Sequence, residues 1–369
     1  MTIYPNLILD ALRTVRYPGT GKDLVTMGMV EDDIRIDGNR VSFSLIFPRA
    51  TDPFIKSVVR ASEVAINTYV GAEVEIRGNI AVKTPQGDPA AKEPEKPLPG
   101  VKNIIGVSSG KGGVGKSTIA CNLAVALAQE GYRVGLLDAD IFGPSVPKMF
   151  GIEDTQLYTH EVDGKVLIIP AERYGVKILS IGFVVDKDKA VLWRGAMASN
   201  ALKQLINEAD WGELDYFIID MPPGTSDIHL TLVQTLGITG AIVVTTPQEV
   251  ALADARKGVS MFLGEHVNVP VLGIVENMSW FTPASHPDEK YYIFGRDGGK
   301  HLAETLQVSL LGQIPLVASI CQSGDEGIPV TLQNSISGRS FTALAGSVVD
   351  AVNQRNATLP PTERVHTHN

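Results

Sequence analysis

The sequence predicts an α/β fold in which a mostly parallel sheet is flanked by helices, preceded by a small α+β domain. Three observations support this. Apolar runs alternate with helically spaced segments after residue 100, a glycine-rich loop joins the first run to a helix, and a proline-rich stretch divides the chain. Such alternation favours βαβ units with helices on both faces of the sheet. Ligands of these sheets bind at the carboxyl ends of the strands.

Length and composition restrict the class of protein. The 369 residues suffice for two domains, and 44% hydrophobic with 20% charged residues is an ordinary globular balance. A net charge of −9 argues against nucleic-acid binding. Two cysteines, Cys121 and Cys321, are too few for a disulfide framework, which favours a cytoplasmic location. The N-terminus lacks a basic flank, and no stretch reaches the ~18 apolar residues of a membrane span, so we expect no membrane partner.

The proline-rich stretch sets the expected domain limits. Residues 84–100 read TPQGDPAAKEPEKPLPG, without apolar periodicity, and are expected to form a linker. Residues 1–83 then form the small α+β domain and residues 101–358 the larger α/β domain. Residues 359–369 are expected to be a flexible tail.

The small domain shows patterns for each of its expected elements. Ile8 to Val15 has helical spacing, Ile34–Ile36 and Val41–Leu45 alternate as a β-hairpin, Ile55 to Tyr69 outlines a longer helix, and Val74–Ile76 is expected to begin a strand. The segment contains no cysteine and no histidine. We therefore expect a packing or docking domain rather than a catalytic one.

In the larger domain, the expected strands are short apolar runs: Asn103–Val107, Val134–Leu137, Tyr216–Ile219, Ala241–Thr245, Val271–Val275 and Leu310–Ile314. The first run is followed by a loop and then by helical spacing from Lys116 to Leu127, which ends at Gly131. Strand, loop and helix therefore occur in the order that a phosphate-binding loop requires.

That loop, GKGGVGKST, matches the frame G-x-x-x-x-G-K-[ST] and predicts a P-loop NTPase fold. In this motif, backbone N–H groups surround the phosphates, Lys116 reaches the β- and γ-phosphate oxygens, and Ser117 holds Mg²⁺. Glycine lets the backbone adopt positive φ and approach phosphate closely. The expected nucleotide-binding residues of the loop are Gly110, Lys111, Gly112, Gly113, Val114, Gly115, Lys116, Ser117 and Thr118.

A second lysine, Lys111, follows the first glycine of the loop. The charge balance of such a site is already met by Lys116 and the metal. A lysine placed here points away from its own phosphate cradle and would meet phosphates bound in a facing copy of the protein. The sequence therefore predicts a nucleotide-dependent homodimer.

Aspartates follow two of the expected strands. Asp138 and Asp140 lie at the end of the second strand, where they are candidates to orient Mg²⁺-bound water or the attacking water. Asp220 ends the apolar run Tyr216–Ile219, and we expect it to hold the metal with Ser117 and Asp138. Aspartates at strand ends also serve as turn residues and helix caps, which is the alternative interpretation.

The segment after Asp220 reads MPPGTSD and is expected to respond to the nucleotide. Gly224 is positioned to offer the γ-phosphate a backbone N–H, and the prolines stiffen a loop that senses its loss. Asn277, after the strand Val271–Val275, is expected at the adenine, because an amide both donates and accepts hydrogen bonds.

Together these motifs resemble the deviant Walker A ATPases of the nitrogenase-iron-protein and Min/Par type, and most closely the iron–sulfur cluster carrier ATPases of the Mrp/ApbC family. The matching segments are GVSSGKGGVGKST, LDADIFGPS, VLWRGAMAS, DMPPGTSDIHLTL, VVTTPQEVALADARKG and GIVENMS. The N-terminal domain is similar to one shared with iron–sulfur assembly factors.

The resemblance implies a cytoplasmic homodimer that hydrolyses ATP with Mg²⁺ and transfers clusters to apoprotein recipients. It also implies that iron–sulfur assembly factors are partners of this homodimer. It places Lys111 in the cross-subunit phosphate contact and Lys116 in the contact within its own subunit. It also assigns Asp140 to the hydrolytic switch and Asn277 to the adenine.

One departure concerns the cluster. Members of this family usually carry a C-x-x-C pair after the ENMS segment, and two such pairs in a dimer would ligate a [4Fe–4S] cluster. Here residues 279–290 contain no cysteine, so the cluster ligands are not evident. His286, Asp288 and Cys321 are candidate ligands. A solvated histidine and a semi-buried free thiol are the alternatives.

Two further functions stay open at this point. A Min/Par-like organising ATPase would bind membrane or DNA through a basic surface, but the last helical region, Phe341–Asp350, is not basic. A metabolic P-loop enzyme acting on a small acid is the other alternative. An assembly helper that holds no cluster itself is a variant of the carrier function.

Overall fold

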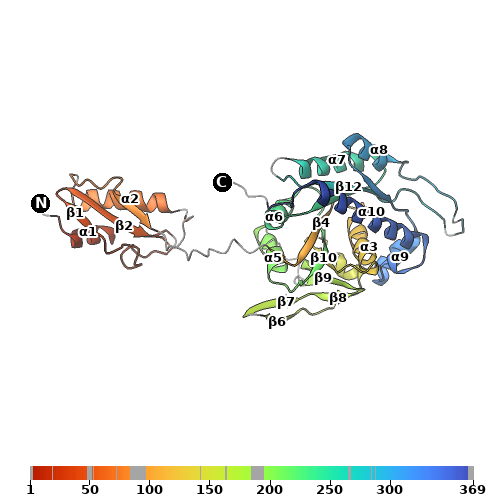
Figure 1. The fold of residues 1–369 in the computed structure, drawn as a ribbon, viewed down its shortest axis with the longest axis horizontal. Helices are drawn as coiled ribbons and strands as arrows, with labels where there is room; N and C mark the ends of the chain where they lie inside the picture. The colour runs from red at the N-terminus through yellow and green to blue at the C-terminus, as the bar shows by residue number, and fades with distance from the viewer. Residues whose placement is uncertain are drawn as a thin grey trace. The chain divides into compact units, whose positions relative to one another are not determined.

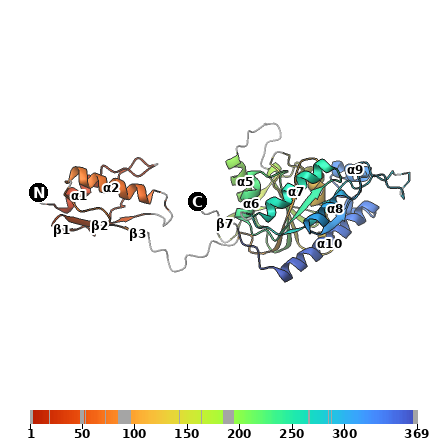
Figure 2. The ribbon, with the colours of Figure 1, turned by 90° about the horizontal axis from the view of Figure 1, so that it is seen from above.

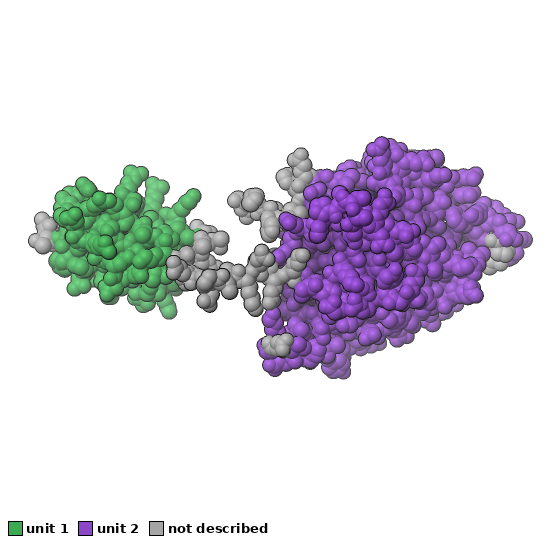
Figure 3. All heavy atoms as spheres, in the orientation of Figure 1, with its two compact units in different colours: residues 1–95 green, residues 96–369 purple. Residues whose placement is uncertain are grey.

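The structure is a computed structural model that describes residues 3–18, 20–47, 52, 54–71, 73–83, 97–141, 143–162, 164–183, 195–264, 267–283, 285–286 and 288–364. It divides into two compact units, Met1–Glu95 and Lys96–Asn369 (Figure 3). Most of the expected linker, residues 84–96, and residues 191–194 of the VLWRGAMAS segment lie outside the described residues. Leu98, at the end of the expected linker, is buried in the core of the second unit.

The first unit packs two helices against a three-stranded sheet of order β1-β2-β3 around one apolar core. Its elements are α1 (Pro5–Leu12), β1 (Arg35–Asp37), β2 (Arg40–Ile46), α2 (Ile55–Tyr69) and β3 (Ile80–Lys83). The hairpin and the longer helix fall where the sequence predicts them.

The strand expected at Val74–Ile76 is wrong. Only Glu75 forms an isolated bridge, to Arg40, and the third strand of the sheet is β3, which runs parallel to β2. The reason is local, because the chain turns at once: Asn79 N donates to Ile76 O, and Gly78 between them has φ of 78°.

In the described residues, the second unit is built on an eight-stranded sheet of order β13-β12-β11-β4-β10-β5-β9-β8. Neighbouring strands are parallel except at the edge, where β8 is antiparallel to β9, so the predicted mostly parallel sheet is confirmed. The strands are β4 (Val101–Ser109), β5 (Val134–Asp138), β8 (Ala171–Arg173), β9 (Val176–Ser180), β10 (Leu214–Asp220), β11 (Gly240–Thr245), β12 (Val271–Glu276) and β13 (Leu310–Gln313).

Helices cover both faces of this sheet (Figures 1 and 2). One face packs against α3 (Lys116–Gln129) and α10 (Ile336–Thr358). The other packs against α5 (Gly195–Asn207), α6 (Asp227–Thr235), α7 (Glu249–Leu263) and α8 (Gly298–Leu306). The short helix α4 (Val146–Met149) contacts α9 (Ala318–Glu326), and β6 (Tyr158–Val162) pairs with β7 (Lys165–Ile169) as a separate hairpin.

The strand order gathers the motifs at one edge of the sheet. The central strands β4, β10 and β5 are neighbours, and Asp220 at the end of β10 is in register with Val107 of β4 and Asp138 of β5. The phosphate loop follows β4, and Asn277 follows β12. Residues separated by more than a hundred positions in the chain therefore meet at the carboxyl ends of the strands, as such sheets require.

The C-terminal segment is held in place beyond the last helix. The Arg355 guanidinium donates hydrogen bonds to Pro360 O at 2.6 Å and to Thr362 Oγ1 at 2.7 Å. The carbonyl of Thr362 also lies so close to Gly237 that a Cβ there would be 2.3 Å from it. The expected flexible tail is therefore anchored as far as Thr362, and residues 365–369 lie outside the described residues.

Candidate functional site

The loop between β4 and α3 depends on glycines with left-handed backbone. Gly113 and Gly115 have φ of 82° and 84°, and Gly115 is the N-cap of α3. A Cβ on Gly115 would lie 2.2 Å from Nδ2 of Asn277. These positions need glycine for conformation and, at Gly115, for space as well. The loop therefore turns sharply into the N-terminus of α3, which is the end of a helix that favours anions.

Gly110 is required for a different reason, because its backbone touches a neighbouring helix. A Cβ on Gly110 would lie 2.1 Å from the carbonyl carbon and oxygen of Asp254 in α7. Gly112 has no atom within 4 Å of the corresponding position. The start of the loop is thus packed against α7, while its middle is open.

Above the loop lies a cavity of about 210 Å³. Its lining consists of loop and helix residues together with groups from facing segments: Ser109, Gly112, Gly113, Gly115, Lys116, Ser117, Thr118, Asp140, Ser145, Met149 and Pro223. Backbone N–H groups, a lysine and hydroxyls around one cavity at a helix N-terminus are the chemistry that phosphates bind.

Lys116 is a buried ammonium between two carboxylates. Its Nζ lies 2.6 Å from Asp220 Oδ1 and 3.6 Å from Asp140 Oδ2, and its side chain is 6% exposed. It also donates to Ser117 Oγ at 3.3 Å. Because Asp220 is fully buried, the charges of Lys116 and Asp220 are stabilised by each other and not by water.

Asp220 has one oxygen in use and one without a partner. Oδ1 accepts from Lys116, whereas Oδ2 is buried and has no hydrogen-bond partner in the described part of the chain. Burial raises the pKa of this carboxyl, and the charge of Lys116 opposes that shift. Buried acceptors are normally satisfied. An unsatisfied carboxylate oxygen beside Ser117 and the phosphate cavity fits a Mg²⁺ ion or its bound water.

Asp138 has both oxygens occupied. Oδ1 accepts from the Asp140 backbone at 3.1 Å, and Oδ2 accepts from Val146 N at 3.2 Å and from Ser180 Oγ at 2.9 Å. Burial, followed by the negative charge of Asp220, raises the pKa of Asp138 to about 8. In this arrangement Asp138 holds the segment that carries Asp140, and a direct role at the metal stays a prediction.

The segment after β10 is bound to the end of β4. Met221 N donates to Val107 O at 3.0 Å, and Gly224 N donates to Ser109 O at 2.9 Å. The N–H that is expected to contact the γ-phosphate therefore has a protein partner here. The Gly224 N–H must break its bond to Ser109 O before it can donate to a phosphate. No pattern in the sequence indicated this bond.

Asn277 contacts the phosphate loop directly. Its Nδ2 donates to Val114 O at 2.8 Å, and the side chain is buried. The amide thus fixes the carbonyl that precedes Gly115. Its expected contact with adenine stays a prediction.

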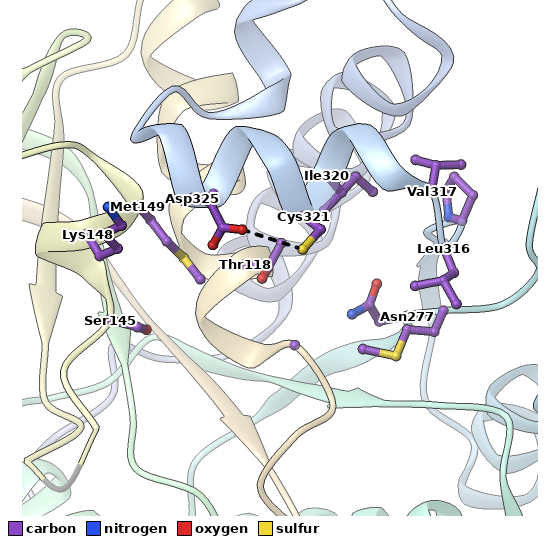
Figure 4. Close-up of a pocket in the computed structure, with 14 residues that line it drawn as sticks. Thr118, Ser145, Lys148, Met149, Asn277, Leu316, Val317, Ile320, Cys321 and Asp325 are labelled. Carbon is purple, nitrogen blue, oxygen red and sulfur yellow. Dashed lines mark hydrogen bonds between the residues drawn. The ribbon is translucent and has the colours of Figure 1, made fainter. Parts of the chain in front are cut away.

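A larger cavity of about 470 Å³ adjoins the phosphate cavity, since Gly115, Thr118, Ser145 and Met149 line both. Figure 4 shows Met149 on one side, Leu316 and Val317 on the other, and Cys321 and Asp325 projecting from α9. The remaining lining residues are Lys148, Asn277, Met278, Pro315, Ile320 and Gly324. A mostly apolar cavity that continues from a phosphate site suits a nucleotide base. Sequence reasoning missed it, because its walls come from four distant segments.

Lys111 lies in the loop between β4 and α3, is half-buried, and forms no ion pair with a described residue. Its carbonyl accepts from Ser109 Oγ at 2.9 Å, which fixes the backbone on which the side chain is carried. Its cross-subunit role stays a prediction.

The two cysteines differ in environment. Cys121 is buried in α3, where burial raises its pKa well above the usual value. Cys321 is exposed on α9, with Sγ 3.9 Å from Asp325 Oδ2, so the alternative interpretation of this residue as a semi-buried free thiol is wrong. Cys321 lies on a helix that lines the larger cavity.

No cluster of three or more histidine, cysteine, aspartate or glutamate side chains suited to a metal ion occurs in the described part of the chain. His286 is exposed, and its Nδ1 lies 3.9 Å from Oε1 of Glu289. Among the described helices, none is long and apolar enough to cross a membrane.

Comparison with known proteins gives matches over both units. A model of the ParA family, described as NUBPL iron-transfer P-loop NTPases, matches residues 100–349, and a model of iron–sulfur cluster assembly proteins matches residues 6–76. An iron–sulfur cluster carrier protein of Synechocystis is 43% identical over 349 residues, covering 94% of this chain and 97% of that protein.

A carrier protein of Haemophilus influenzae is 41% identical over 363 residues, covering 96% of this chain and 94% of that protein. Among solved structures, a nucleotide-binding protein from Archaeoglobus fulgidus in complex with ADP is 35% identical, with a TM-score of 0.56. That match covers 67% of this chain and 94% of the other.

Proposed function

The chain belongs to the ParA family of NUBPL iron-transfer P-loop NTPases, and we propose that it is an ATP-hydrolysing carrier that transfers iron–sulfur clusters to apoproteins. The observation that carries the proposal is the phosphate cavity, where Lys116 and Asp220 form a buried pair beside Ser117. Relatives named iron–sulfur cluster carrier proteins match it over nearly the full chain. An organising or metabolic ATPase is less well supported, because the family model names iron transfer.

The geometry supports a role for each residue in hydrolysis. Lys116 leaves Asp220 Oδ1 to bind the β- and γ-phosphate oxygens of ATP, so its positive charge stays buried and paired throughout. Ser117 and Asp220 would hold Mg²⁺, which neutralises charge on the phosphates when bound. Asp140 lines the same cavity and orients the attacking water, while Asp138 fixes its backbone through the hydrogen bond to its N–H. Positioning and electrostatics supply most of the catalysis.

We further propose that two copies face each other across the nucleotide, with Lys111 of one copy contacting phosphates bound by the other. Lys111 is half-buried and forms no ion pair with a described residue, which supports this, because such a cation can pair with an incoming anion. The base would occupy the cavity of about 470 Å³, next to Asn277.

The cluster is the cargo in this proposal, and its ligands are not complete within one copy. Cys321 is the exposed cysteine of the two, and two copies would provide two thiolates. The match of residues 6–76 to iron–sulfur assembly proteins supports a contact with other assembly factors through the small domain. The limits 1–83 for the small domain and 101–358 for the ATPase domain, and a cytoplasmic location, are further parts of the proposal.

Anaerobic reconstitution tests carriage. The purified full chain is incubated with iron, sulfide and a thiol, desalted, and assayed for iron, acid-labile sulfide and visible absorbance, with and without ATP. We expect stoichiometric iron and sulfide and transfer to an apo-ferredoxin. Cys321→Ser is the test variant and Cys121→Ser, at the buried thiol, is its matched control.

A chain that hydrolyses ATP but retains no iron would contradict direct carriage and favour the second candidate, an assembly helper that holds no cluster. The lack of a metal-binding side-chain cluster in the described residues is the observation that keeps this candidate open.

A further inference from the structure

His229 is a buried histidine that none of the proposed hydrolytic roles uses. It lies in the first turn of α6, directly after the segment that carries Gly224, and is 2% exposed. Its Nδ1 accepts a hydrogen bond from Ser226 N at 3.2 Å. Since Nδ1 is the acceptor, the neutral ring carries its proton on Nε2.

The proton on Nε2 is directed at the strand that leads into the phosphate loop. Nε2 lies 3.4 Å from Oγ of Ser108, which is itself buried. The ring also packs edge-on against Phe262 of α7, with the ring centroids 6.4 Å apart. Burial lowers the pKa of His229 to about 4, so the ring is neutral near pH 7 and keeps this single donor.

The end of β4 therefore contacts both the segment after Asp220 and the phosphate loop. Ser109 O accepts from Gly224 N, Ser109 Oγ donates to Lys111 O, and Ser108 Oγ contacts His229. Two adjacent residues thus link the segment after Asp220 with the phosphate loop.

The segment between Asp220 and His229 is fixed at both ends. At its start, Asp220 pairs with Lys116 and the next residue, Met221, bonds to Val107 O. At its far end, His229 caps α6 and contacts Ser108. Only the short stretch in between, with its two prolines, is left to move when Gly224 N exchanges Ser109 O for a phosphate oxygen.

We propose that His229 is a positioning residue for ATP hydrolysis, which holds the far end of this segment against Ser108 so that the Gly224 N–H lies within reach of the γ-phosphate. The inference rests on the proposed role of Gly224. A contact of 3.4 Å is long for an N–H···O hydrogen bond, so its loss changes rates several-fold rather than by orders of magnitude.

Three variants distinguish the effect of the contact between His229 and Ser108 from that of the helix-capping bond between His229 and Ser226. Ser108→Ala removes the acceptor and leaves the bond between His229 and Ser226 in place. His229→Gln keeps an acceptor for Ser226 N, because glutamine occupies this position in capping boxes. His229→Ala removes both contacts. Thr235→Ala is the matched control, since it removes a buried hydroxyl from the same helix.

For each full-length variant, kcat, the affinities for ADP and for a non-hydrolysable ATP analogue, and hydrogen exchange of residues 221–230 are measured. For Ser108→Ala we expect kcat and analogue affinity to fall about fivefold, ADP affinity to stay within about twofold, and exchange in 221–230 to rise. For His229→Gln we expect the same changes in kcat, affinity and exchange as for Ser108→Ala. His229→Ala should lose more kcat and analogue affinity, and Thr235→Ala should match the wild type in all of these measurements.

A merely structural role predicts a different result, with ADP and analogue affinity falling together. That result, or unchanged exchange and unchanged analogue-to-ADP preference in Ser108→Ala, overturns the proposal. Nitrogen-15 spectra of the histidine rings give a reading that is independent of turnover: we expect a neutral ring protonated on Nε2 at pH 7, and protonation on Nδ1 overturns the proposal. A wild type that hydrolyses no ATP contradicts the proposed function, while the spectra and exchange rates still test the contact.

Discussion

The ammonium of Lys116 lies 2.6 Å from Oδ1 of Asp220, and both side chains are buried. Two opposite charges in the interior compensate each other, but either one alone is costly. Asp220 therefore keeps the buried Lys116 charged and in position to bind phosphate.

Removing one partner of this pair should lower the free energy of unfolding more than removing both partners does. Lys116→Met leaves the Asp220 carboxylate buried without a cation, and we expect it to lower the free energy of unfolding by about 3–5 kcal/mol. The double variant Lys116→Met/Asp220→Asn should recover most of that loss, although neither variant hydrolyses ATP. Urea unfolding of the second unit measures both. Equal stabilities for the single and double variants would show that the pair is uncoupled.

Substituting Lys111 tests the facing-copy arrangement. Lys111→Ala should reduce ATP hydrolysis by at least about a hundredfold and leave nucleotide affinity within a few-fold of the wild type, because the lost cation serves the partner's phosphates. Mixing this variant with Lys116→Ala protein should restore activity at mixed sites. Loss of nucleotide binding to the degree seen in Lys116→Ala would contradict the cross-subunit role.

Two glycines in the same loop make a matched pair. Gly110→Ala places a methyl group 2.1 Å from the backbone of Asp254, which has no freedom to move aside, so the melting temperature should fall by several degrees. Gly112→Ala meets no atom within 4 Å and has no positive φ, so its melting temperature should stay unchanged. Differential scanning calorimetry without nucleotide checks the pair. A stable Gly110→Ala variant would mean that α7 does not pack as described.

The exposed thiol permits a test of the base cavity. The indole of Cys321→Trp would occupy part of the cavity of about 470 Å³ that Cys321 lines, so ATP affinity should fall at least about tenfold. Because Cys321 is exposed, stability should change little. Cys321→Ser is the isosteric control and should bind ATP normally. Fluorescence titration with a labelled nucleotide gives both affinities, and unchanged binding by the tryptophan variant would place the base elsewhere.

The buried imidazole should make stability depend on pH. The pKa of His229 is lowered from 6.5 to about 4, so the unfolded chain takes up the proton first as the pH falls. Its contribution to stability is complete above pH 6.5 and is lost progressively toward pH 4, to a total of about 3 kcal/mol. His229→Gln should lack this component, while His301→Gln, at an exposed histidine, should keep it. Parallel stability–pH curves for wild type and His229→Gln would contradict the assignment.

Much of the fold could be predicted because its strands are uninterrupted apolar runs. Tyr216–Ile219 falls within β10 and Val134–Leu137 within β5. Strand β9 was missed, since Val176–Ser180 is short and contains Lys177, whose ammonium reaches backbone carbonyls instead of water. Its place in the sheet is set by pairing with β5, which is a tertiary effect that the local pattern does not contain.

The identity of the phosphate-site residues was also predictable, because the motif fixes their spacing. Their present partners were not. The bonds from Lys116 to Asp220 and from Gly224 to Ser109 join segments more than a hundred positions apart. The spacing Ser226 to His229 resembles a capping box with histidine in place of glutamate or glutamine, which is the one local pattern that would have drawn attention to His229.

The strands that carry the site, β12, β11, β4, β10 and β5, are consecutive in the sheet. Neighbouring strands lie about 4.8 Å apart, so Asn277 at one end and Asp138 at the other are separated by four spacings, about 19 Å. The spacing of the strands therefore sets the distance between the points at which the segments carrying Asn277 and Asp140 leave the sheet.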